Sequence, residues 1–170
     1  RVCLCPLDKG DLEILRAMIN NPDVTEFLAT FLPKSREDEE EWYEKQRTSA
    51  KEIHFAVVLA ETGELIGTMG LTDISYLHGT AGTGSVFRPQ FWGKGYGTEA
   101  KLLVLDFAFN SLNLRKIIST VLATNPRSKR CLEKCGYHEE GLLKAHFFRT
   151  GTYQDLYQMV CFRDGFEEAQ

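Results

Sequence analysis

The sequence predicts a single α/β (α+β) domain with a mixed, mostly antiparallel sheet flanked by helices. Three observations support this prediction. Short β-branched runs alternate with helical segments, no linker or internal repeat divides the 170 residues, and the last two strand-like runs are joined by a short turn. Because a chain of this length buries a core as one unit, residues 1–170 are expected to form one domain.

The first half of the chain is expected to open with a strand and to pass through three helical segments into a pair of strands. Asp8 or Asp11 can cap the first helix, and Ser35 can cap the third. In order, we expect a strand at 1–7, a helix at 12–19 that stops at 20–23, helices at 24–28 and 36–50, a strand at 53–60, a tight turn at 61–64 and a strand at 65–74.

The helix expected at 36–50 begins with acidic residues and ends with basic ones. This order suits the helix dipole, so a solvated, self-stabilising helix is the simplest interpretation. Attraction of a polyamine or a basic peptide to the acidic start is the alternative.

The second half is expected to place a glycine-rich loop between a strand and a long helix. In order, we expect a polar connection at 75–84, a strand at 85–88, the loop, helices at 100–109 and 126–136 with a strand at 115–123 between them, and an antiparallel pair at 137–148 and 153–162. Pro126 marks the start of the later helix, and Gly136 marks its end. The helix at 100–109 is apolar on nearly every side, so it must be packed over most of its surface.

Composition excludes several classes of protein. A hydrophobic content of 43% indicates a globular protein, and no apolar run approaches the roughly 20 residues of a membrane span. A net charge of −4 argues against a nucleic-acid partner and mildly favours a cationic substrate. The five cysteines form neither a disulfide framework nor a zinc-spaced cluster, so we expect reduced thiols, no metal site and, since no signal peptide is evident, a cytoplasmic location.

The loop Gln90-Phe91-Trp92-Gly93-Lys94-Gly95-Tyr96-Gly97-Thr98 is expected to bind a diphosphate. Glycines at alternate positions leave the backbone open to a ligand. Free main-chain N–H groups then gather at a helix N-terminus, where the dipole favours negative charge, and Lys94 adds a positive charge.

The spacing narrows the choice of ligand. A dinucleotide-binding fingerprint would need a third glycine at the position of Thr98, and the Walker A spacing does not occur. A strand-to-helix loop of the form Gln-x-x-Gly-x-Gly remains. A glycine-rich turn that only caps a core helix is the alternative.

Three stretches follow one another along the chain, and the first of them contains this loop. They are Arg88-Pro89-Gln90-Phe91-Trp92-Gly93-Lys94-Gly95-Tyr96-Gly97-Thr98-Glu99-Ala100, Asn125-Pro126-Arg127-Ser128, and Glu133-Lys134-Cys135-Gly136-Tyr137 with Glu140-Gly141. Together they resemble the GCN5-related N-acetyltransferase family, in the branch of the ribosomal-protein N-terminal acetylases and the spermidine acetyltransferases. The resemblance covers residues 65–162, and the N-terminal third is similar only in pattern.

The resemblance implies acetyl-CoA as cofactor and assigns residues to it. Main-chain groups of Val86, Phe87 and Arg88 would pair with the pantetheine arm. The loop from Gly93 through Lys94, Gly95, Tyr96 and Gly97 to Thr98 would bind the pyrophosphate. Asn125 would hydrogen-bond a pantetheine amide, and Ser128 would lie near the thioester sulfur.

The resemblance also bears on catalysis. Ser128 is the candidate proton donor to the leaving thiolate, with a purely structural role in its helix as the alternative. Many members of the family use a tyrosine at the position of Leu132, and relatives often carry a glutamate at the position of Gly82. Candidates for a general base are Asp73, His78, His146 and Asp155, with water-mediated deprotonation as a further route.

Other nucleophiles and roles are less favoured. His54 and His146 lie in strand-like segments, where a structural histidine is the common outcome, and Cys131 or Cys135 in a helix interior are usually inert packing. The leading hypothesis is an acetyl-CoA-dependent N-acetyltransferase in which a small amine, a polyamine or a protein N-terminus attacks directly in a ternary complex. A non-catalytic acyl-CoA-binding regulatory domain is the alternative from another class. The sequence leaves the acceptor and the oligomeric state open, a homodimer included.

Overall fold

A computed structural model describes residues 1–29 and 32–168 of the chain. Their strands form one sheet in the order β1-β2-β3-β4-β5-β7-β6. The strands are β1 (Val2–Pro6), β2 (Ile53–Leu59), β3 (Leu65–Ser75), β4 (Thr80–Phe87), β5 (Lys116–Leu122), β6 (His138–Arg149) and β7 (Thr152–Phe162). Only the β4–β5 pair among them is parallel. The predicted fold class, a mixed and mostly antiparallel sheet flanked by helices, is confirmed.

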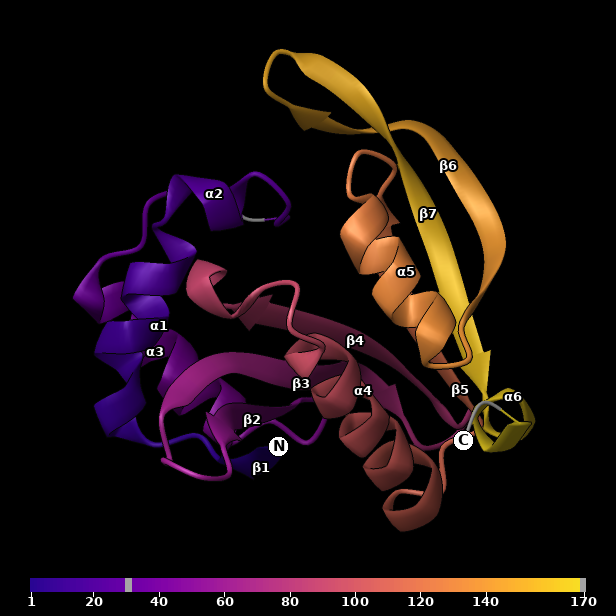
Figure 1. The fold of residues 1–170 in the computed structure, drawn as a ribbon, viewed down its shortest axis with the longest axis horizontal. Helices are drawn as coiled ribbons and strands as arrows, with labels where there is room; N and C mark the ends of the chain where they lie inside the picture. The colour runs from indigo at the N-terminus through magenta and orange to yellow at the C-terminus, as the bar shows by residue number, and fades with distance from the viewer. Residues whose placement is uncertain (30–31, 169–170) are drawn as a thin grey trace.

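The helices gather on two sides of the sheet (Figure 1). They are η1 (Lys9–Asp11), α1 (Leu12–Ile19), α2 (Pro22–Thr25), α3 (Arg36–Arg47), η2 (Pro89–Phe91), α4 (Tyr96–Asp106), η3 (Phe107–Ser111), α5 (Pro126–Lys134) and α6 (Arg163–Glu168). The N-terminal helices α1, α2 and α3 lie together at one side of the molecule, and α5 lies beside the long β6–β7 hairpin at the other. None of the described helices is both long and apolar enough to cross a membrane.

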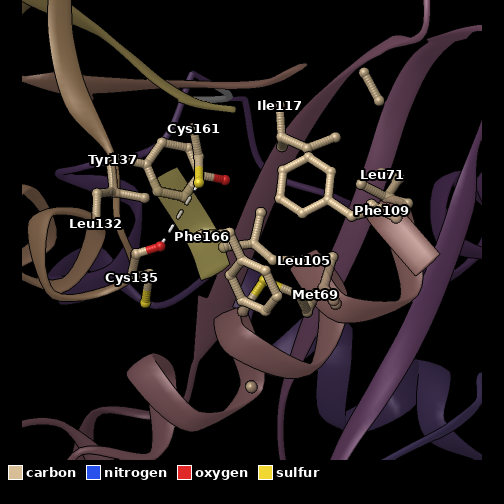
Figure 2. Packing of buried hydrophobic residues seen from close by; sticks show 14 of the residues in the cluster. Met69, Leu71, Leu105, Phe109, Ile117, Leu132, Cys135, Tyr137, Cys161 and Phe166 are labelled. Atoms are coloured by element: carbon tan, nitrogen blue, oxygen red, sulfur yellow. Dashed lines mark hydrogen bonds between the residues drawn. The ribbon is translucent and has the colours of Figure 1, made fainter. Parts of the chain in front are cut away.

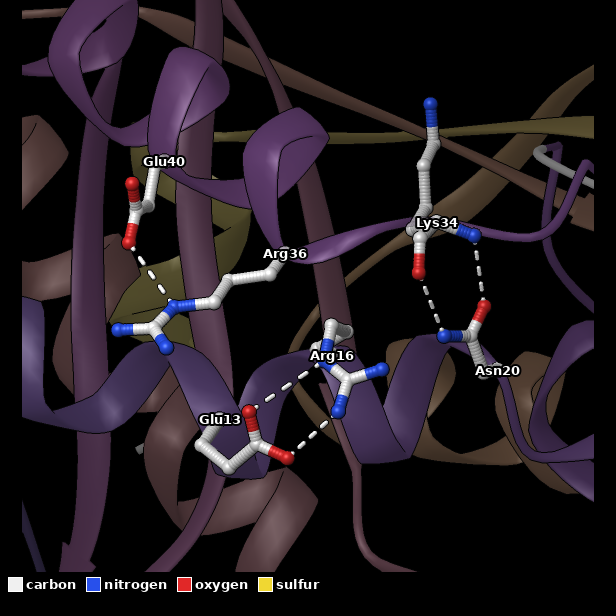
Figure 3. A network of polar contacts seen from close by, with 6 residues as sticks. All are labelled: Glu13, Arg16, Asn20, Lys34, Arg36 and Glu40. Atoms are coloured by element: carbon white, nitrogen blue, oxygen red, sulfur yellow. Dashed lines mark hydrogen bonds and ion pairs between the residues drawn. The ribbon is translucent and has the colours of Figure 1, made fainter.

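Local signals set the starts of the N-terminal helices. Ser35 and Asp38 form the reciprocal capping box at the start of α3, as the sequence predicted for Ser35. Figure 3 shows two further contacts that tie α1 to the segment before α3: Asn20 Nδ2 donates to the Lys34 carbonyl, and Lys34 N–H donates to Asn20 Oδ1, each at 2.8 Å. The entry into α3 is therefore fixed against the end of α1.

Several predicted boundaries are corrected. The short helix begins at Pro22 rather than at residue 24, because Asn21 caps it by accepting from the Asp23 N–H. The helix predicted at 36–50 ends at Arg47. The short helix, predicted at 24–28, ends at Thr25.

The region predicted as a polar connection at 75–84 is half strand. β4 begins at Thr80, where it pairs with Ser75 of β3 across a short turn, and residues 80–82 also pair with β5 in a parallel ladder. The predicted helix at 100–109 begins four residues earlier, at Tyr96, and its last part is the π-helical turn η3. The C-terminal helix α6 was not predicted.

The main core lies between the sheet and helix α4 (Figure 2). Ala100, Val104 and Leu105 of α4 are fully buried, as its apolar sequence predicted, whereas Leu103 is 42% exposed. Because α4 is packed on most sides, its first turn is held rigidly against the sheet. The glycine-rich loop is therefore presented by a fixed helix.

Candidate active site

Strands β4 and β5 separate partway along the sheet. Their parallel pairing is limited to three residue pairs, the last of which joins Gly82 to Ile118. Beyond it, in the described chain, β4 runs on to Phe87 and β5 to Leu122 without pairing to each other. The free edge of β4 is therefore open to a ligand that lies along the strand.

A cavity of about 760 Å³ includes this opening. It extends from the glycine-rich loop and α5 to the N-terminal helices. The predicted site residues that line it are Val86, Phe87, Gly93, Gly95, Gly97, Thr98, Asn125 and Ser128. The three other predicted residues, all within the described chain, lie outside its lining: Arg88, Lys94 and Tyr96. The structure thus brings together segments that are far apart in the sequence.

The glycine-rich loop has a left-handed backbone at two of its glycines. Gly93 (φ +74°) and Gly95 (φ +88°) both lie in the left-handed region, which favours glycine. Gly95 precedes the first helical residue of α4, and the N–H groups of residues 96–98 have no acceptor in the described chain. A Cβ added at Gly93 would meet no atom within 4 Å, so the loop is open on that side. These features fit a bound pyrophosphate.

Arg1 holds the loop from the neighbouring end of β1. Its Nε donates to Glu99 Oε1 at 2.7 Å, and its Nη2 donates to the Lys94 carbonyl at 2.8 Å. The guanidinium also lies over the Tyr96 ring, and its hydrogen bond to Glu99 holds the pKa of that carboxyl below its ordinary value. Sequence analysis missed this contact, because nothing local links residues 98 positions apart.

The main-chain groups of β4 are divided between its two edges. The Arg88 N–H donates to the Ile66 carbonyl of the β3 side at 2.9 Å, so it is not free for a ligand. Because successive residues of a strand face opposite edges, the Phe87 N–H and C=O face the opening. The indole of Trp92 donates to that C=O at 2.8 Å, which leaves the Phe87 N–H available.

Helix α5 presents its first turn to the cavity. Asn125 caps the helix through its side-chain oxygen, which accepts from the Ser128 N–H at 3.1 Å. Its amide NH₂ makes no hydrogen bond within the described chain and remains for a ligand. The Ser128 hydroxyl is likewise without a hydrogen bond among the described residues. The hydroxyl therefore satisfies no backbone group in the first turn of the helix, which was the alternative role for Ser128. The catalytic role of Ser128 stays a prediction.

None of the four candidate bases lines the cavity in the part of the chain that the structure describes; these are Asp73, His78, His146 and Asp155. Asp155 is paired with Lys144 at 2.8 Å. The structure explains why position 82 is a glycine in this chain: a Cβ there would lie 2.8 Å from Thr72 Oγ1. A glutamate at this position would require the Thr72 side chain to move.

The far end of the cavity holds side chains that sequence analysis did not assign to the site. His54 contacts Glu52 at 3.2 Å, and the ring of Trp42 meets His54 edge-on at 5.1 Å. Glu39 is only 3% exposed, and its Oε2 has no hydrogen-bond partner in the described chain. Burial raises the pKa of this carboxyl. The i, i+3 spacing of Glu39 and Trp42 on one face of α3 was the available signal.

The open edge of β4 and the free N–H groups at the start of α4 fit a transferase that takes an acyl group from a coenzyme A thioester. The free β4 edge accommodates an extended pantetheine arm, and the loop accommodates the pyrophosphate. The remaining end of the cavity is available to the acceptor.

Comparison with known proteins agrees with this class. The family model for the acetyltransferase (GNAT) domain matches residues 1–138, so the chain belongs to the GNAT acetyltransferase family. Spermidine N(1)-acetyltransferase of Vibrio cholerae is 33% identical over 159 residues, which cover 94% of this chain and 91% of that protein. The Escherichia coli K12 enzyme of the same name is 29% identical over 162 residues, which cover 95% of this chain and 86% of that protein.

A solved structure is similar over nearly the whole chain. Spermidine N-acetyltransferase from V. cholerae, in complex with CoA and spermine, superposes with a TM-score of 0.92 at 32% identity, covering 98% of each chain. The resemblance seen in the sequence motifs is confirmed. This chain is an N-acetyltransferase, and acetyl-CoA is its acyl donor.

Proposed function

We propose that this enzyme acetylates a primary amine of a small polyamine, which attacks acetyl-CoA directly in a ternary complex. The observation that carries the proposal is the Glu39 carboxylate. It is buried, one of its oxygens lacks a partner in the described chain, and it lines the same cavity as the glycine-rich loop. A buried carboxylate oxygen without a partner is costly, and an ammonium group of a ligand would satisfy it.

The surroundings of Glu39 favour an extended cationic ligand. Trp42 and His54 provide aromatic surface next to the carboxylate, which suits the methylene chain and the charge of a polyamine. One amine would be held at Glu39 while another reaches the thioester near the β4–β5 opening. A protein N-terminus offers only one ammonium group at its end, so it would leave the carboxylate unpaired.

The relatives support the same class of acceptor. Two of them are named spermidine N(1)-acetyltransferases, and the similar solved structure contains spermine together with CoA. Those substrates belong to the relatives. For this chain they supply the acceptors that are worth testing first.

The proposal includes roles for the cofactor-binding residues. Acetyl-CoA supplies the activated acyl group. The Phe87 N–H, which the Trp92 contact leaves available, would polarise the thioester carbonyl, and the Asn125 NH₂ would orient the pantetheine arm. The Ser128 hydroxyl donates a proton to the leaving thiolate, since Leu132 stands where relatives use a tyrosine. Water carries the proton from the amine to solvent.

The test has two parts. Calorimetry measures binding of coenzyme A, and thiol release from acetyl-CoA is then followed with spermidine, a monoamine and a peptide with a free N-terminus. We expect tight binding and the fastest release with spermidine. Binding without release for any acceptor would support the non-catalytic alternative, and a preference for the peptide would transfer the proposal to protein N-termini.

A further inference from the structure

Lys101 is a buried lysine in the wall of the cofactor cavity. Its side chain extends from the second turn of α4, is only 3% exposed and lines the cavity. The Nζ donates to Thr83 Oγ1 at 2.9 Å. No carboxylate pairs with it among the described residues, so a neutral hydroxyl is the partner that the structure shows.

The position of Thr83 places the amine at the closed end of the β4–β5 opening. Thr83 directly follows Gly82, where the pairing between the two strands stops. The Ser119 hydroxyl of β5 donates a hydrogen bond to the Thr83 carbonyl at 3.2 Å. The Lys101 amine therefore lies at the point from which the strands diverge, beside the path assigned to the pantetheine arm.

The groups around this amine are two hydroxyls and two cysteines. The Tyr137 hydroxyl lies 3.2 Å from Thr83 Oγ1, and burial raises the pKa of Tyr137 well above its usual range. Cys131 of α5 and Cys135, which directly follows that helix, also lie near the amine, and Tyr137 and Cys135 are drawn in Figure 2. Burial lowers the pKa of Lys101 to about 8, so a large share of the amine is unprotonated in mildly alkaline solution.

We propose that Lys101 is an internal acceptor and that the enzyme acetylates its own Lys101 Nζ when no external amine occupies the site. The inference rests on acetyl-CoA as acyl donor and not on the identity of the external acceptor. The unprotonated Nζ attacks the thioester carbonyl carbon, a C–N bond forms and the C–S bond breaks. Coenzyme A leaves as the thiolate, which takes up the proton that the nitrogen releases. The product is an uncharged amide, which a buried position tolerates better than an ammonium group.

Cys131 is the competing nucleophile. Its thiol lies 3.4 Å from Thr98 Oγ1 and lines the cavity. A hydrogen bond with Cys135 is the main cause that lowers the pKa of Cys131 to about 6, and the Lys101 charge contributes. Acetylation at sulfur would give a thioester, which hydroxylamine cleaves, whereas the amide on Lys101 resists it.

The experiment incubates the purified chain with acetyl-CoA at pH 8 without an acceptor. Intact-mass measurement follows incorporation, and peptide mapping of the wild-type protein locates the acetyl group without relying on any variant. Lys101→Arg keeps the charge but cannot be acetylated, Lys101→Met is a second variant, and exposed Lys45→Arg is the matched control. We expect one hydroxylamine-resistant acetyl group on Lys101, formed on the order of a hundredfold faster than on an exposed lysine because the amine is less protonated. It should be absent in both Lys101 variants and unchanged in Lys45→Arg.

Three results would overturn the inference. These are an acetyl group that maps to another residue, one that hydroxylamine removes, and no incorporation by a protein that still acetylates spermidine. The last result leaves the proposed function intact. Failure to bind coenzyme A at all would overturn the proposed function as well.

Discussion

Replacing Glu39 by Gln separates recognition of the acceptor from the stability of the fold. The substitution keeps the shape of the side chain and removes its charge. Because Glu39 is 3% exposed and its Oε2 is unpaired in the described chain, the charge benefits the folded protein little without a ligand. With a polyamine bound, the same charge would pair with an ammonium group. Activity and stability should therefore change in opposite directions.

The expected magnitudes follow from the burial. Two unit charges about 4 Å apart attract by about 4 kcal/mol at an effective dielectric constant near 20, which is an upper bound. A hydrogen bond to a charged group contributes about 2 kcal/mol after desolvation, so kcat/KM for spermidine should fall about thirtyfold. A monoamine has no second ammonium group, so its kcat/KM should change by less than about threefold.

The sign of the stability change follows from the pKa. Burial raises the pKa of Glu39, so the stability associated with the protonated carboxyl is full below the unfolded-state pKa and is lost as the pH rises through the folded-state pKa. At neutral pH the charged form is present, and its removal should stabilise the fold by about 1 kcal/mol, or about 3 °C in Tm.

Initial rates of thiol release with spermidine and with a monoamine, together with thermal unfolding at pH 7, test both expectations. Glu41→Gln is the matched control, because it makes the same charge change at an exposed position two residues away. Equal losses for spermidine and the monoamine would show that Glu39 does not bind a distal amine. A lower Tm in Glu39→Gln would show that the carboxylate supports the fold instead.

Three further predictions test the cofactor site and the buried lysine. Gly95→Glu should abolish binding of coenzyme A in calorimetry, because a carboxylate at the start of α4 would repel the pyrophosphate, and normal binding by this variant would refute the loop assignment. Gly95→Ala should destabilise the fold by at least about 1 kcal/mol, because the left-handed backbone strains an alanine and its Cβ would lie 3.0 Å from Arg1 Nη2. Ser128→Ala should lower kcat about a hundredfold with little change in the Kd for coenzyme A, and an unchanged kcat would exclude Ser128 as the acid. Since burial lowers the pKa of Lys101 to about 8, the unfolded chain binds the extra proton, and stability rises as the pH increases from about 8 to 10. Lys101→Met should be about 3 kcal/mol more stable than wild type at pH 7 in denaturant unfolding, and the gap should close by pH 10; a gap independent of pH would refute the account.

Much of the fold could be predicted from local patterns. Ser35 announced the start of α3, Pro126 and Gly136 bracketed α5, and the β-branched runs gave most strands. The start of β4 at Thr80 was not predicted. There the strand pairs with β3 across a short turn and with β5, more than thirty residues later in the chain. Polar residues and glycines gave no periodic signal there.

The candidate site shows the same division. Glycines at 93, 95 and 97 predicted an open loop, because the lack of a side chain is a property of single residues. The candidate bases Asp73, His78 and His146 were chosen from residue type alone, and the structure places them away from the cavity. The residue type determines which chemistry a side chain can perform, whereas its neighbours depend on the tertiary packing.

By itself, the sequence determined that a glycine-rich loop joins a strand to a buried helix and that the chain resembles an acetyltransferase. Those features are written in short stretches, where backbone preference and spacing act locally. Only the tertiary structure decided that Glu39 and His54 share a cavity with the loop, that Arg1 holds it and that Lys101 ends at the β4–β5 opening. Each of these depends on contacts between distant segments, whose free energy comes from burial and pairing that no local stretch contains.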